Sequence, residues 1–518
     1  MKKTHLSLRK VGSFSKMFLD YIEGQDALKE FYEWKPKIES FQSAITNKAF
    51  SPANRKTLVD ALERQYDGLT CVSKLSENIQ SFSEARTFTV TTGHQLNILT
   101  GPLYFLFKLI TTINLSKKLK AHYPDYHFIP VYWMATEDHD FEEISYFNMF
   151  GKKYQWTTEQ TGAVGRFDPS SLTEVLDQVR ENVELFEKAY GRFKTLADSV
   201  RFYVNELFGS EGLIVVDGDD PQLKAQFAPI MKDDILNQNT HQRVKQTNEQ
   251  LIDLGYKSQA FSRPINFFYL DDFRRRIISD GENFSVVNSD IKFTKREILS
   301  EIDHYPERFS PNVIMRPVYQ EVILPNIAYL GGSAEIIYWL QLKGVFDYYK
   351  MSFPVLMPRN FGMIINQTTA KKAKKLGIAN EQLFRSKQQL KADYLSRTST
   401  YQPNLNDQKQ SFSDLFESIK IKVEMIDQSL GGYIGSEEAK AIKALAHIEK
   451  KLKKSLEKNH RTALTQIEGI KDRLFPNGVL QERSENYLNF YFNNTALIKE
   501  LLDEFEPFEF SFYLFWEE

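Results

Sequence analysis

Two short apolar runs in the first third of the chain each end in a cluster of polar residues. Thr87-Phe-Thr-Val-Thr-Thr is rich in β-branched residues, and Phe128-Ile-Pro-Val-Tyr-Trp-Met-Ala is almost wholly apolar. Runs of this kind are typical of buried strands. Between them Thr100-Gly-Pro predicts the start of a helix, whose apolar residues recur at helical spacing, at Leu106, Leu109, Ile110 and Ile113. Strand, helix and strand in this order predict a βαβ unit of a parallel sheet.

The strand pattern returns later in the chain, with helical sequence between its last two occurrences. Apolar runs begin at Gly212 (Gly-Leu-Ile-Val-Val-Asp), at Asn312 (Asn-Val-Ile-Met) and at Pro354 (Pro-Val-Leu-Met-Pro). Residues 333–350 have the spacing of an amphipathic helix. These elements predict that the α/β winding continues to about residue 365.

The remaining segments predict the domain organisation. Residues 1–85 read as a helical lead-in and residues 86–365 as the sheet core. Within the core, residues 150–205 and 225–305 are too long for ordinary connections and are predicted to be insertions. Residues 475–518 are expected to return to the core.

A Lys-rich helical arm is predicted over residues 366–474, with a polar break at 398–410 and an interruption at Gly431-Gly432. Its second half repeats apolar residues in steps of three and four, as a coiled-coil seam does, at Leu445, Ile448, Leu452 and Leu456. Two arrangements fit this pattern. One is a helical hairpin within the chain, and the other, which we favour, is an arm that pairs two chains in a homodimer.

Composition narrows the class of protein. The 518 residues include 66 Lys and Arg against 68 Asp and Glu, a balance that disfavours nucleic acid and anionic membranes as partners. The chain begins without an apolar leader, and its sequence has no stretch of about 20 apolar residues, so we expect a cytoplasmic protein that does not span a membrane. Cys71 is the single cysteine, which excludes an internal disulfide, and we expect it to be a buried structural thiol.

The loop after the first strand has the residues of an anion site. It contains Gly93-His94-Gln95-Leu-Asn97 and leads into the predicted helix start at Thr100. Backbone N–H groups at a helix start hold phosphate or carboxylate, and a histidine donates to a charged oxygen or exchanges a proton near neutral pH. The alternative is purely structural, with Thr100 as a helix cap and His94 as a hydrogen-bonded loop residue.

The loop after the second strand concentrates ionisable side chains in Thr136-Glu137-Asp138-His139-Asp140. Neighbouring charges at a strand end repel or desolvate one another unless a ligand, metal or internal pairing compensates. Asp140 alone is explained as a cap of the next helix. The others are suited to holding a substrate amine, orienting His139 as a base or binding a divalent metal, of which the metal is the least favoured.

A third segment joins Arg316 and Gln320 to a glycine pair, Gly331-Gly332, and to Glu335. Arg316 is suited to clamping a carboxylate, and the glycine pair would let a ligand approach the backbone at a helix start. A glycine pair is also common turn chemistry. Lys350-Met-Ser has a slight likeness to the phosphate-gripping loop of adenylating enzymes.

Several of these blocks together resemble the family of the bacillithiol biosynthesis cysteine-adding enzyme, or bacillithiol synthase. The likeness covers nearly the whole chain, in order, at Thr92-Gly-His-Gln-Leu-Asn, Thr100-Gly-Pro-Leu-Tyr, Pro130-Val-Tyr-Trp-Met-Ala-Thr-Glu-Asp-His-Asp-Phe-Glu-Glu-Ile, Phe309-Ser-Pro-Asn-Val-Ile-Met-Arg-Pro and Leu474-Phe-Pro-Asn-Gly-Val-Leu-Gln-Glu-Arg. The resemblance implies a Rossmann-like, nucleotidyltransferase-like core with connecting insertions and a coiled-coil domain that forms a homodimer. It also implies a ligase that joins the carboxyl group of L-cysteine to the amine of glucosaminyl-malate.

An amide made from a free carboxylate needs activation, for which ATP is the ordinary source. We therefore expect ATP as a co-substrate. The candidate catalytic residues are His94, Asp138 and His139. The candidate substrate-binding residues are Gln95, Asn97, Tyr104, Glu137, Asp140, Arg316, Gln320 and Glu335. The candidate nucleotide-binding residues are Gly93, Thr100, Gly101, Gly331, Gly332 and Lys350.

The chain departs from adenylating relatives in having one histidine in the Gly93-His94-Gln95 loop and no second lysine after Lys350. These departures weigh against AMP-forming chemistry. Two other functions fit the sequence. One is an ATP-dependent ligase or nucleotidyltransferase for another small acid, and the other is a coiled-coil scaffold with a non-catalytic nucleotide pocket.

Overall fold

The computed structural model describes residues 1–70, 72–399 and 404–517, which form two compact units. The core unit comprises Lys3–Ile364 and Leu480–Phe515, and the arm unit comprises Ile365–Val479. Cys71, predicted to be a buried thiol, lies outside the described residues. Within those residues, no helix is both long enough and apolar enough to span a bilayer.

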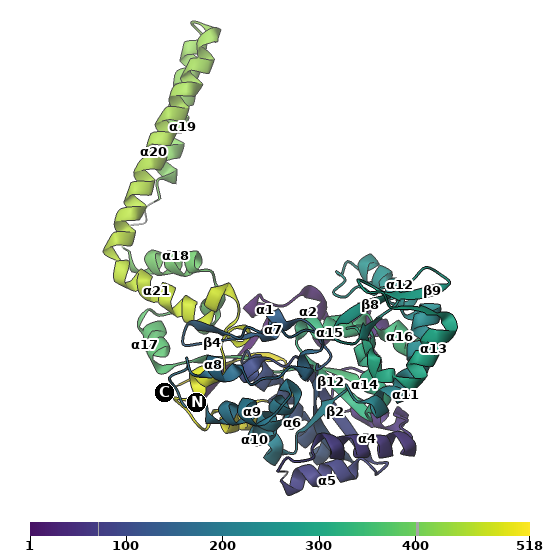
Figure 1. The fold of residues 1–518 in the computed structure, drawn as a ribbon. Coiled ribbons are helices and arrows are strands. Elements are labelled where there is room, and N and C mark those ends of the chain that lie inside the picture. Colours follow the sequence, from purple (N-terminus) through teal and green to yellow (C-terminus); the bar gives the residue numbers. More distant parts are fainter. Residues whose placement is uncertain (71, 400–403, 518) are drawn as a thin grey trace. The chain divides into compact units, whose positions relative to one another are not determined.

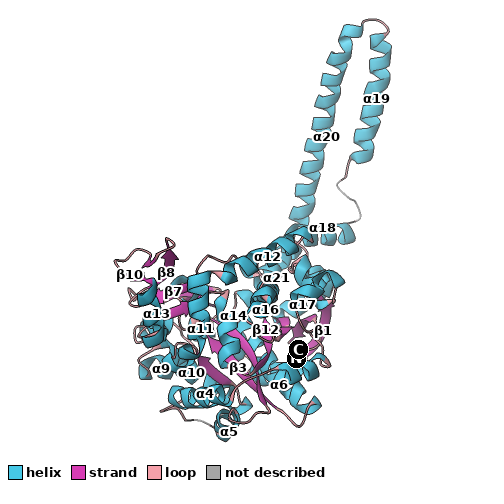
Figure 2. Ribbon diagram, turned by 90° about the vertical axis from the view of Figure 1, so that its right-hand side faces the viewer, coloured by secondary structure: helices cyan, strands magenta, loops and turns pink. Residues whose placement is uncertain are grey.

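A five-stranded parallel sheet forms the centre of the core unit (Figures 1 and 2). Its strands, in spatial order, are β13 (Val355–Pro358), β12 (Asn326–Gly331), β2 (Thr87–His94), β3 (His127–Met134) and β6 (Ile214–Asp217). The first strand of this sheet in the chain lies in the middle, and later strands are added on both sides, which is the Rossmann order. The predicted Rossmann-like core is therefore confirmed.

Burial explains why these segments form strands rather than helices or loops. Residues Thr87–Thr92 of β2 are all buried, so both faces of this strand are covered. The helix α6 (Tyr104–His122) packs along β2 and β3, and its Leu115 and Leu119 join Val90 in one apolar cluster. A parallel strand buried on both faces has a continuous β-branched and apolar sequence, as observed here.

One predicted helix start and one predicted strand are wrong. The helix α6 begins at Tyr104 instead of Thr100, because Leu99 and Thr100 have left-handed backbones with φ of 48° and 68°. The run after Asn312 is not a strand. The Asn312 side-chain oxygen accepts hydrogen bonds from the backbone N–H groups of Ile314 and Met315, at 2.9 and 3.2 Å, and so initiates the helix α14 (Met315–Ile323).

The first insertion folds against the loop that follows β3. In the structure it begins before the predicted residue 150, with the short helix α7 (Phe141–Ile144) and the hairpin of β4 (Tyr146–Met149) and β5 (Lys152–Gln155). It ends with α8 (Leu172–Leu176), α9 (Glu184–Arg192) and α10 (Leu196–Phe208). Between these parts, the turn η3 (Val164–Arg166) donates two backbone hydrogen bonds to the acidic loop, from Val164 to Asp138 O (2.7 Å) and from Gly165 to Thr136 O (2.8 Å).

The second insertion supplies two helices and an antiparallel sheet. The helices are α11 (Pro221–Asn237) and α12 (Asn239–Asp253). The sheet has the order β10 (Lys292–Thr294), β9 (Asn283–Val286), β8 (Arg274–Ser279), β7 (Phe267–Leu270) and β11 (Phe309–Pro311), with α13 (Lys295–His304) between β10 and β11. Its strands β8 and β11 carry side chains to the carboxyl edge of the parallel sheet.

The two chain ends meet in a three-stranded sheet. The strand β15 (Ser511–Trp516) lies between β1 (Lys2–Ser7) and β14 (Phe361–Ile365). The lead-in therefore starts with a strand, and its helices follow as α1 (Leu8–Val11), α2 (Lys16–Ile22), α3 (Ser40–Asn47), α4 (Pro52–Gln65) and α5 (Ser73–Ser81). Residues Leu480–Phe515 belong to the core unit, and they include α22 (Leu488–Tyr491) and α23 (Leu497–Glu504).

The arm unit is helical and contains an antiparallel hairpin of α19 (Asn406–Glu424) and α20 (Gly431–Asn459), visible in Figure 2. Its other helices are α17 (Gln367–Lys375), α18 (Lys387–Thr398) and α21 (Arg461–Leu474). Gly431-Gly432 starts α20 after a turn and does not interrupt a helix, so that expectation is corrected. The hairpin within the chain, one of the two predicted arrangements, is present.

Gly165 is expected to be essential for seating the first insertion on the acidic loop. A Cβ atom at this position would lie 2.5 Å from Cβ and 2.9 Å from Cα of Thr136. Gly165→Ala should therefore cost about 1–3 kcal/mol and lower the thermal midpoint of unfolding. The matched control is Gly191→Ala in α9, where nothing lies within 4 Å, and it should leave the midpoint unchanged or raise it slightly. Equal midpoints for the two variants would contradict this account.

Candidate active site

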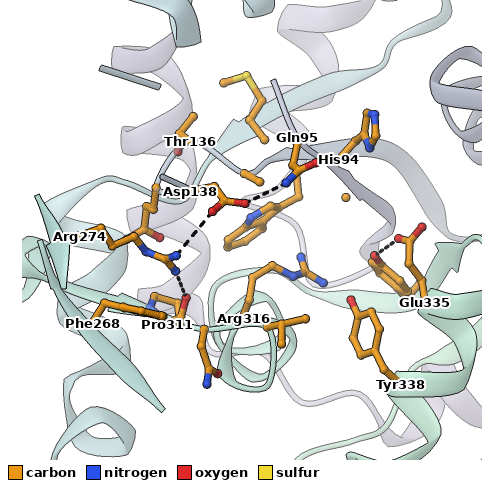
Figure 3. A pocket seen from close by; sticks show the side chains of 18 of the residues that line it. His94, Gln95, Thr136, Asp138, Phe268, Arg274, Pro311, Arg316, Glu335 and Tyr338 are labelled. Carbon is orange, nitrogen blue, oxygen red and sulfur yellow. Dashed lines mark hydrogen bonds and ion pairs between the residues drawn. The ribbon is translucent and has the colours of Figure 1, made fainter. Parts of the chain in front are cut away.

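A cavity of about 600 Å³ opens at the carboxyl edge of the parallel sheet (Figure 3). The ends of β2 and β3 form one side of it, at Gly93–Gln95 and Trp133–Asp138. The second insertion and α14 form much of the remainder, with Arg274 and Arg316. Its volume lies within the range of small-molecule sites, and its position is where ligands bind in open α/β sheets. The two predicted polar loops therefore meet in one cavity.

Asp138 is held as an anion on the cavity wall. One carboxylate oxygen accepts a hydrogen bond from Gln95 Nε2 at 3.0 Å, and the other accepts from the backbone N–H of His139 at 2.8 Å. Arg274 Nη1 lies 3.6 Å from the same carboxylate (Figure 3). Burial favours the neutral acid, but these donors outweigh it and hold the pKa of Asp138 below its ordinary value. A carboxylate stabilised in this way is a weak base and a good partner for an ammonium group.

Glu137 points into a separate network of buried charges. It forms an ion pair with Lys224, which is fully buried and also lies 3.3 Å from Asp219. Burial favours the neutral amine, but the two carboxylates outweigh it and raise the pKa of Lys224. Arg166, which belongs to the first insertion, forms an ion pair with Asp219. Glu137 thus lines the cavity with its charge already paired, which fixes the acidic loop in place.

Arg316 has an unused donor inside the cavity. Its guanidinium lies over the rings of Trp133 and Tyr329, 5.6 and 5.4 Å from their centroids, and Nη1 donates to Gln320 Oε1 at 3.1 Å. Its Nη2 is buried and has no hydrogen-bond partner among the described residues. A buried, unpaired guanidinium N–H costs free energy unless a ligand accepts from it. The geometry suits a carboxylate or a phosphoryl oxygen.

A buried ion pair between Lys108 and Glu335 borders the cavity near the end of β2. Lys108 Nζ lies 2.7 Å from Glu335 Oε1 and donates to Gly93 O at 2.7 Å. The Tyr329 hydroxyl donates to the other Glu335 oxygen at 2.8 Å. Burial opposes ionisation, but the Lys108 charge lowers the pKa of Glu335. The pair places an ammonium group beside the loop of His94.

His94 borders the cavity as a neutral imidazole. Its ring stacks on Phe105, with centroids 5.1 Å apart, and meets Tyr104 edge-on at 5.2 Å. Burial, reinforced by the positive charges of Lys108 and Arg359, holds the pKa of His94 well below its ordinary value. The expected proton exchange near neutral pH is therefore not supported. Its Nε2 is buried and unpaired among the described residues, so a neutral hydrogen bond to a ligand remains available.

Tyr104 lines the cavity beside His94. Burial raises its pKa to about 12, so its hydroxyl stays protonated and can donate to a ligand.

Three residues predicted from the first loop lie behind the cavity. Asn97 donates to Glu143 O at 3.0 Å, and Thr100 is fully buried in the turn before α6. Asn486 Nδ2 donates to Leu99 O at 2.7 Å and to Gly101 O at 2.8 Å. The predictions for Asn97, Thr100 and Gly101 as ligand contacts are corrected, since these residues shape the loop and do not line the cavity.

Two residues of the acidic loop, His139 and Asp140, do not belong to the cavity lining. Asp140 is exposed and precedes α7 without a side-chain capping bond. His139 is also exposed, and its Nδ1 lies 3.2 Å from Arg274 Nη1. Asp138 Oδ1 lies 3.5 Å from the same Nδ1, so this nitrogen faces both a donor and an acceptor. His139 therefore remains a predicted base, although it does not belong to the cavity lining.

The residues predicted near the later strands include some that support the cavity wall and some that lie outside the cavity lining. Gln320 is fully buried behind Arg316 and orients it. Glu335 caps its own helix, α15 (Ser333–Leu340), by accepting from Gly332 N at 3.1 Å, and Gly331 packs against the Glu335 side chain. This self-capping occupies part of the helix start that was predicted to bind a nucleotide, and neither glycine lines the cavity.

Lys350 lies at the opposite edge of the sheet from the cavity. It follows α16 (Lys343–Tyr348) and precedes the amino end of β13, whereas the cavity lies at the carboxyl ends of the strands. Its prediction as a phosphate ligand is therefore corrected. Gly93 alone of the six predicted nucleotide contacts lines the cavity.

Sequence reasoning missed Lys108 and Arg274. Lys108 had a usable signal, as the only charged residue in the first two turns of α6, among Phe105, Phe107 and Leu109. Arg274 had none, because β8 reaches Asp138 only through the tertiary fold. No cluster of three or more His, Cys, Asp or Glu side chains suited to a metal occurs in the part of the chain that the structure describes.

The fold and the cavity define the class of protein, a Rossmann-like protein with a small-molecule site at the carboxyl edge of its sheet. Two family models match the chain, described as "Bacillithiol biosynthesis BshC, N-terminal Rossmann-like domain" over residues 1–360 and "Bacillithiol biosynthesis BshC, C-terminal coiled-coil domain" over residues 362–516. The chain belongs to this bacillithiol biosynthesis family.

Relatives extend the match over the whole chain. A protein of Flavobacterium psychrophilum is 42% identical, one of Flavobacterium johnsoniae is 41% identical and one of Cytophaga hutchinsonii is 39% identical. Each match covers 98% of this chain and 98% of the relative. All three carry the name "Putative cysteine ligase BshC".

The buried state of His94 makes a prediction for spectroscopy. Because burial and the charges of Lys108 and Arg359 lower its pKa, the His94 ring should remain neutral from about pH 6 to 8. Side-chain nitrogen shifts of labelled histidine, with His94→Gln to assign the signal, should show no titration in that range. A His94 signal that titrates near pH 6.5 would contradict the buried environment.

Proposed function

We propose that this chain is a carbon–nitrogen ligase that joins the carboxyl group of L-cysteine to the amine of glucosaminyl-malate, forming bacillithiol. The observation that carries the proposal is one cavity with an ionised Asp138 and a buried, unpaired Arg316 N–H. Together they match substrates that bear both ammonium and carboxylate groups. The family's place in bacillithiol biosynthesis and the relatives' name as cysteine ligases support the assignment.

Each charged group then has a role that fits its surroundings. Asp138, a weak base, holds the ammonium group of cysteine. Arg316 binds a carboxylate of the malate moiety through its unpaired Nη2. His94 and Lys108 donate to the oxygen of the reacting carboxyl group, where negative charge develops as the amide forms. The ligase is expected to work in the cytoplasm.

ATP, when bound, supplies the activation that a free carboxylate needs before an amine can displace its oxygen. The residues that fit its phosphates are Lys108 and His94, because Lys108 carries an ammonium group and His94 Nε2 is buried and unpaired. Phosphoryl transfer would give ADP and phosphate, and adenylyl transfer would give AMP and pyrophosphate.

The reconstituted reaction tests the proposal. Purified protein with cysteine, glucosaminyl-malate and ATP should form bacillithiol, detected as a new thiol by mass spectrometry, with one nucleotide consumed per amide. Nucleotide analysis of the same samples distinguishes ADP from AMP. Absence of the thiol under conditions where the protein is folded would overturn the assignment.

The role of Asp138 is tested by two adjacent substitutions of the same kind. Asp138→Asn removes the charge that holds the ammonium group, and kcat/KM for cysteine should fall roughly 10- to 100-fold. Asp140→Asn removes an exposed charge two residues away that does not line the cavity, and it should stay within about twofold of the parent. Full turnover by a normally folded Asp138→Asn enzyme would remove the assignment.

We also propose that the arm unit pairs two chains. No residue of α19 is buried and only Gly431 of α20 is buried, yet the hairpin carries large apolar side chains, among them Ile421, Ile448 and Leu452. Ile448 and Leu452 are 50% and 45% exposed and lie four residues apart on one face. A second copy of the hairpin would cover this stripe in the manner of a coiled coil.

The pairing makes a prediction for solution mass. Ile448→Asp with Leu452→Asp should convert a dimer to a monomer, because two charges would be buried in an apolar interface. Lys450→Asp, on an exposed position of the same helix, is the control and should leave the dimer intact. Sedimentation equilibrium measures the mass. A parent protein that is monomeric at all concentrations would exclude the pairing.

A further inference from the structure

An aromatic side chain at the cavity lining is left largely in water. Phe261 belongs to the segment 257–263, which is part of the connection between α12 and β7, and it lines the cavity while 76% exposed. No other large apolar side chain among the described residues of the core unit is as exposed. Leaving a phenylalanine in water forgoes about 1.5–3 kcal/mol that burial would give. A ligand that covers the ring recovers part of this free energy.

The backbone around Phe261 is fixed, so the ring is presented to the cavity by an anchored segment. Gln341 is fully buried, and its Oε1 accepts from the backbone N–H groups of Gln259 and Ala260, at 3.0 and 2.9 Å. On the other side, Ser262 Oγ lies 2.9 Å from His241 Nδ1.

The base of the same segment is tied to the protein interior. Asn266 Oδ1 accepts from Arg263 N at 3.1 Å, and Asn266 N donates to the buried Asp234 at 2.8 Å. The Asn312 side chain, which belongs to the cavity lining, donates to Asn266 Oδ1 at 3.0 Å. The segment therefore holds a defined position relative to the cavity.

Arg263 is the cation of this segment. Its side chain lines the cavity, is exposed and has no hydrogen-bond or ion-pair partner among the described residues. The two other cavity arginines have partners, Arg274 with Ser310 and Pro311 and Arg316 with Gln320. Arg263 is therefore free to bind an anionic group of a ligand that extends past Arg316.

We propose that Phe261 and Arg263 form a specificity clamp for the larger, amine-bearing substrate. This inference rests on the proposed function and deepens it. The ring of Phe261 packs on the apolar face of the sugar, and Arg263 binds a carboxylate of the malate moiety. Cysteine, which has neither a sugar ring nor a second carboxylate, is held by Asp138 and does not need the clamp.

Binding by calorimetry tests the clamp separately from catalysis, with glucosaminyl-malate, malate and cysteine as probes. Phe261→Ala should weaken the binding of glucosaminyl-malate roughly tenfold and leave the affinity for malate unchanged, because malate has no sugar ring. Arg263→Gln should weaken the binding of both glucosaminyl-malate and malate roughly tenfold. Neither variant should change cysteine binding by more than about twofold.

Matched controls exist in the same insertion. Phe273→Ala removes an exposed aromatic ring, and Arg276→Gln removes an exposed arginine, and neither residue lines the cavity. Both controls should bind all three probes as the parent does.

The outcomes separate the clamp from the function on which it rests. If the parent binds glucosaminyl-malate and both clamp variants bind it equally well, the clamp is overturned and the proposed function stands. If Phe261→Ala weakens the binding of cysteine instead, the segment contacts the other substrate and the proposal is again overturned. If the parent does not bind glucosaminyl-malate, the clamp and the proposed function both fail.

Discussion

The parallel pairing of β2 with β3 determines where the chemistry of this protein can occur. In this pairing Gly93 lies opposite Trp133 and His94 opposite Met134, and the backbone N–H of Ala135 still donates to His94 O at 3.0 Å. The two loops therefore leave the sheet at the same level. A shift of one residue would turn every side chain of β3 to the other face and separate the loops. The apolar burial of both strands holds this register, and so the core maintains the site.

Charge compensation then decides which groups remain available for a ligand. Glu137 and Lys224 satisfy one another, as do Lys108 and Glu335, and these pairs are stable in a low-dielectric interior only because each partner is present. Arg316 Nη2 and His94 Nε2 are left without partners. Both residues border the cavity, where a ligand can complete these two atoms, whereas the paired charges hold the walls.

The sequence was a good guide wherever local pattern and function coincided. The β-branched run before Gly93 and the acidic cluster around Asp138 predicted a sheet edge with a polar site, because strand ends in parallel sheets converge. Thr100 and Lys350 misled, since each lies near a strand or helix boundary along the chain but not at the cavity. Arg274 and Phe261 come from an insertion whose fold has no short-range signal, so only the tertiary structure brings them to Asp138.

The arrangement of the two histidines constrains how the proton of the amine is removed. His94 is neutral and buried, and its free nitrogen is placed to meet a charged oxygen. His139 Nδ1 lies 3.2 Å from Arg274 Nη1 and 3.5 Å from Asp138 Oδ1. Asp138 is too strongly stabilised as an anion to be an effective base. Of the three predicted catalytic residues, the exposed His139 is therefore left as the candidate base for the amine.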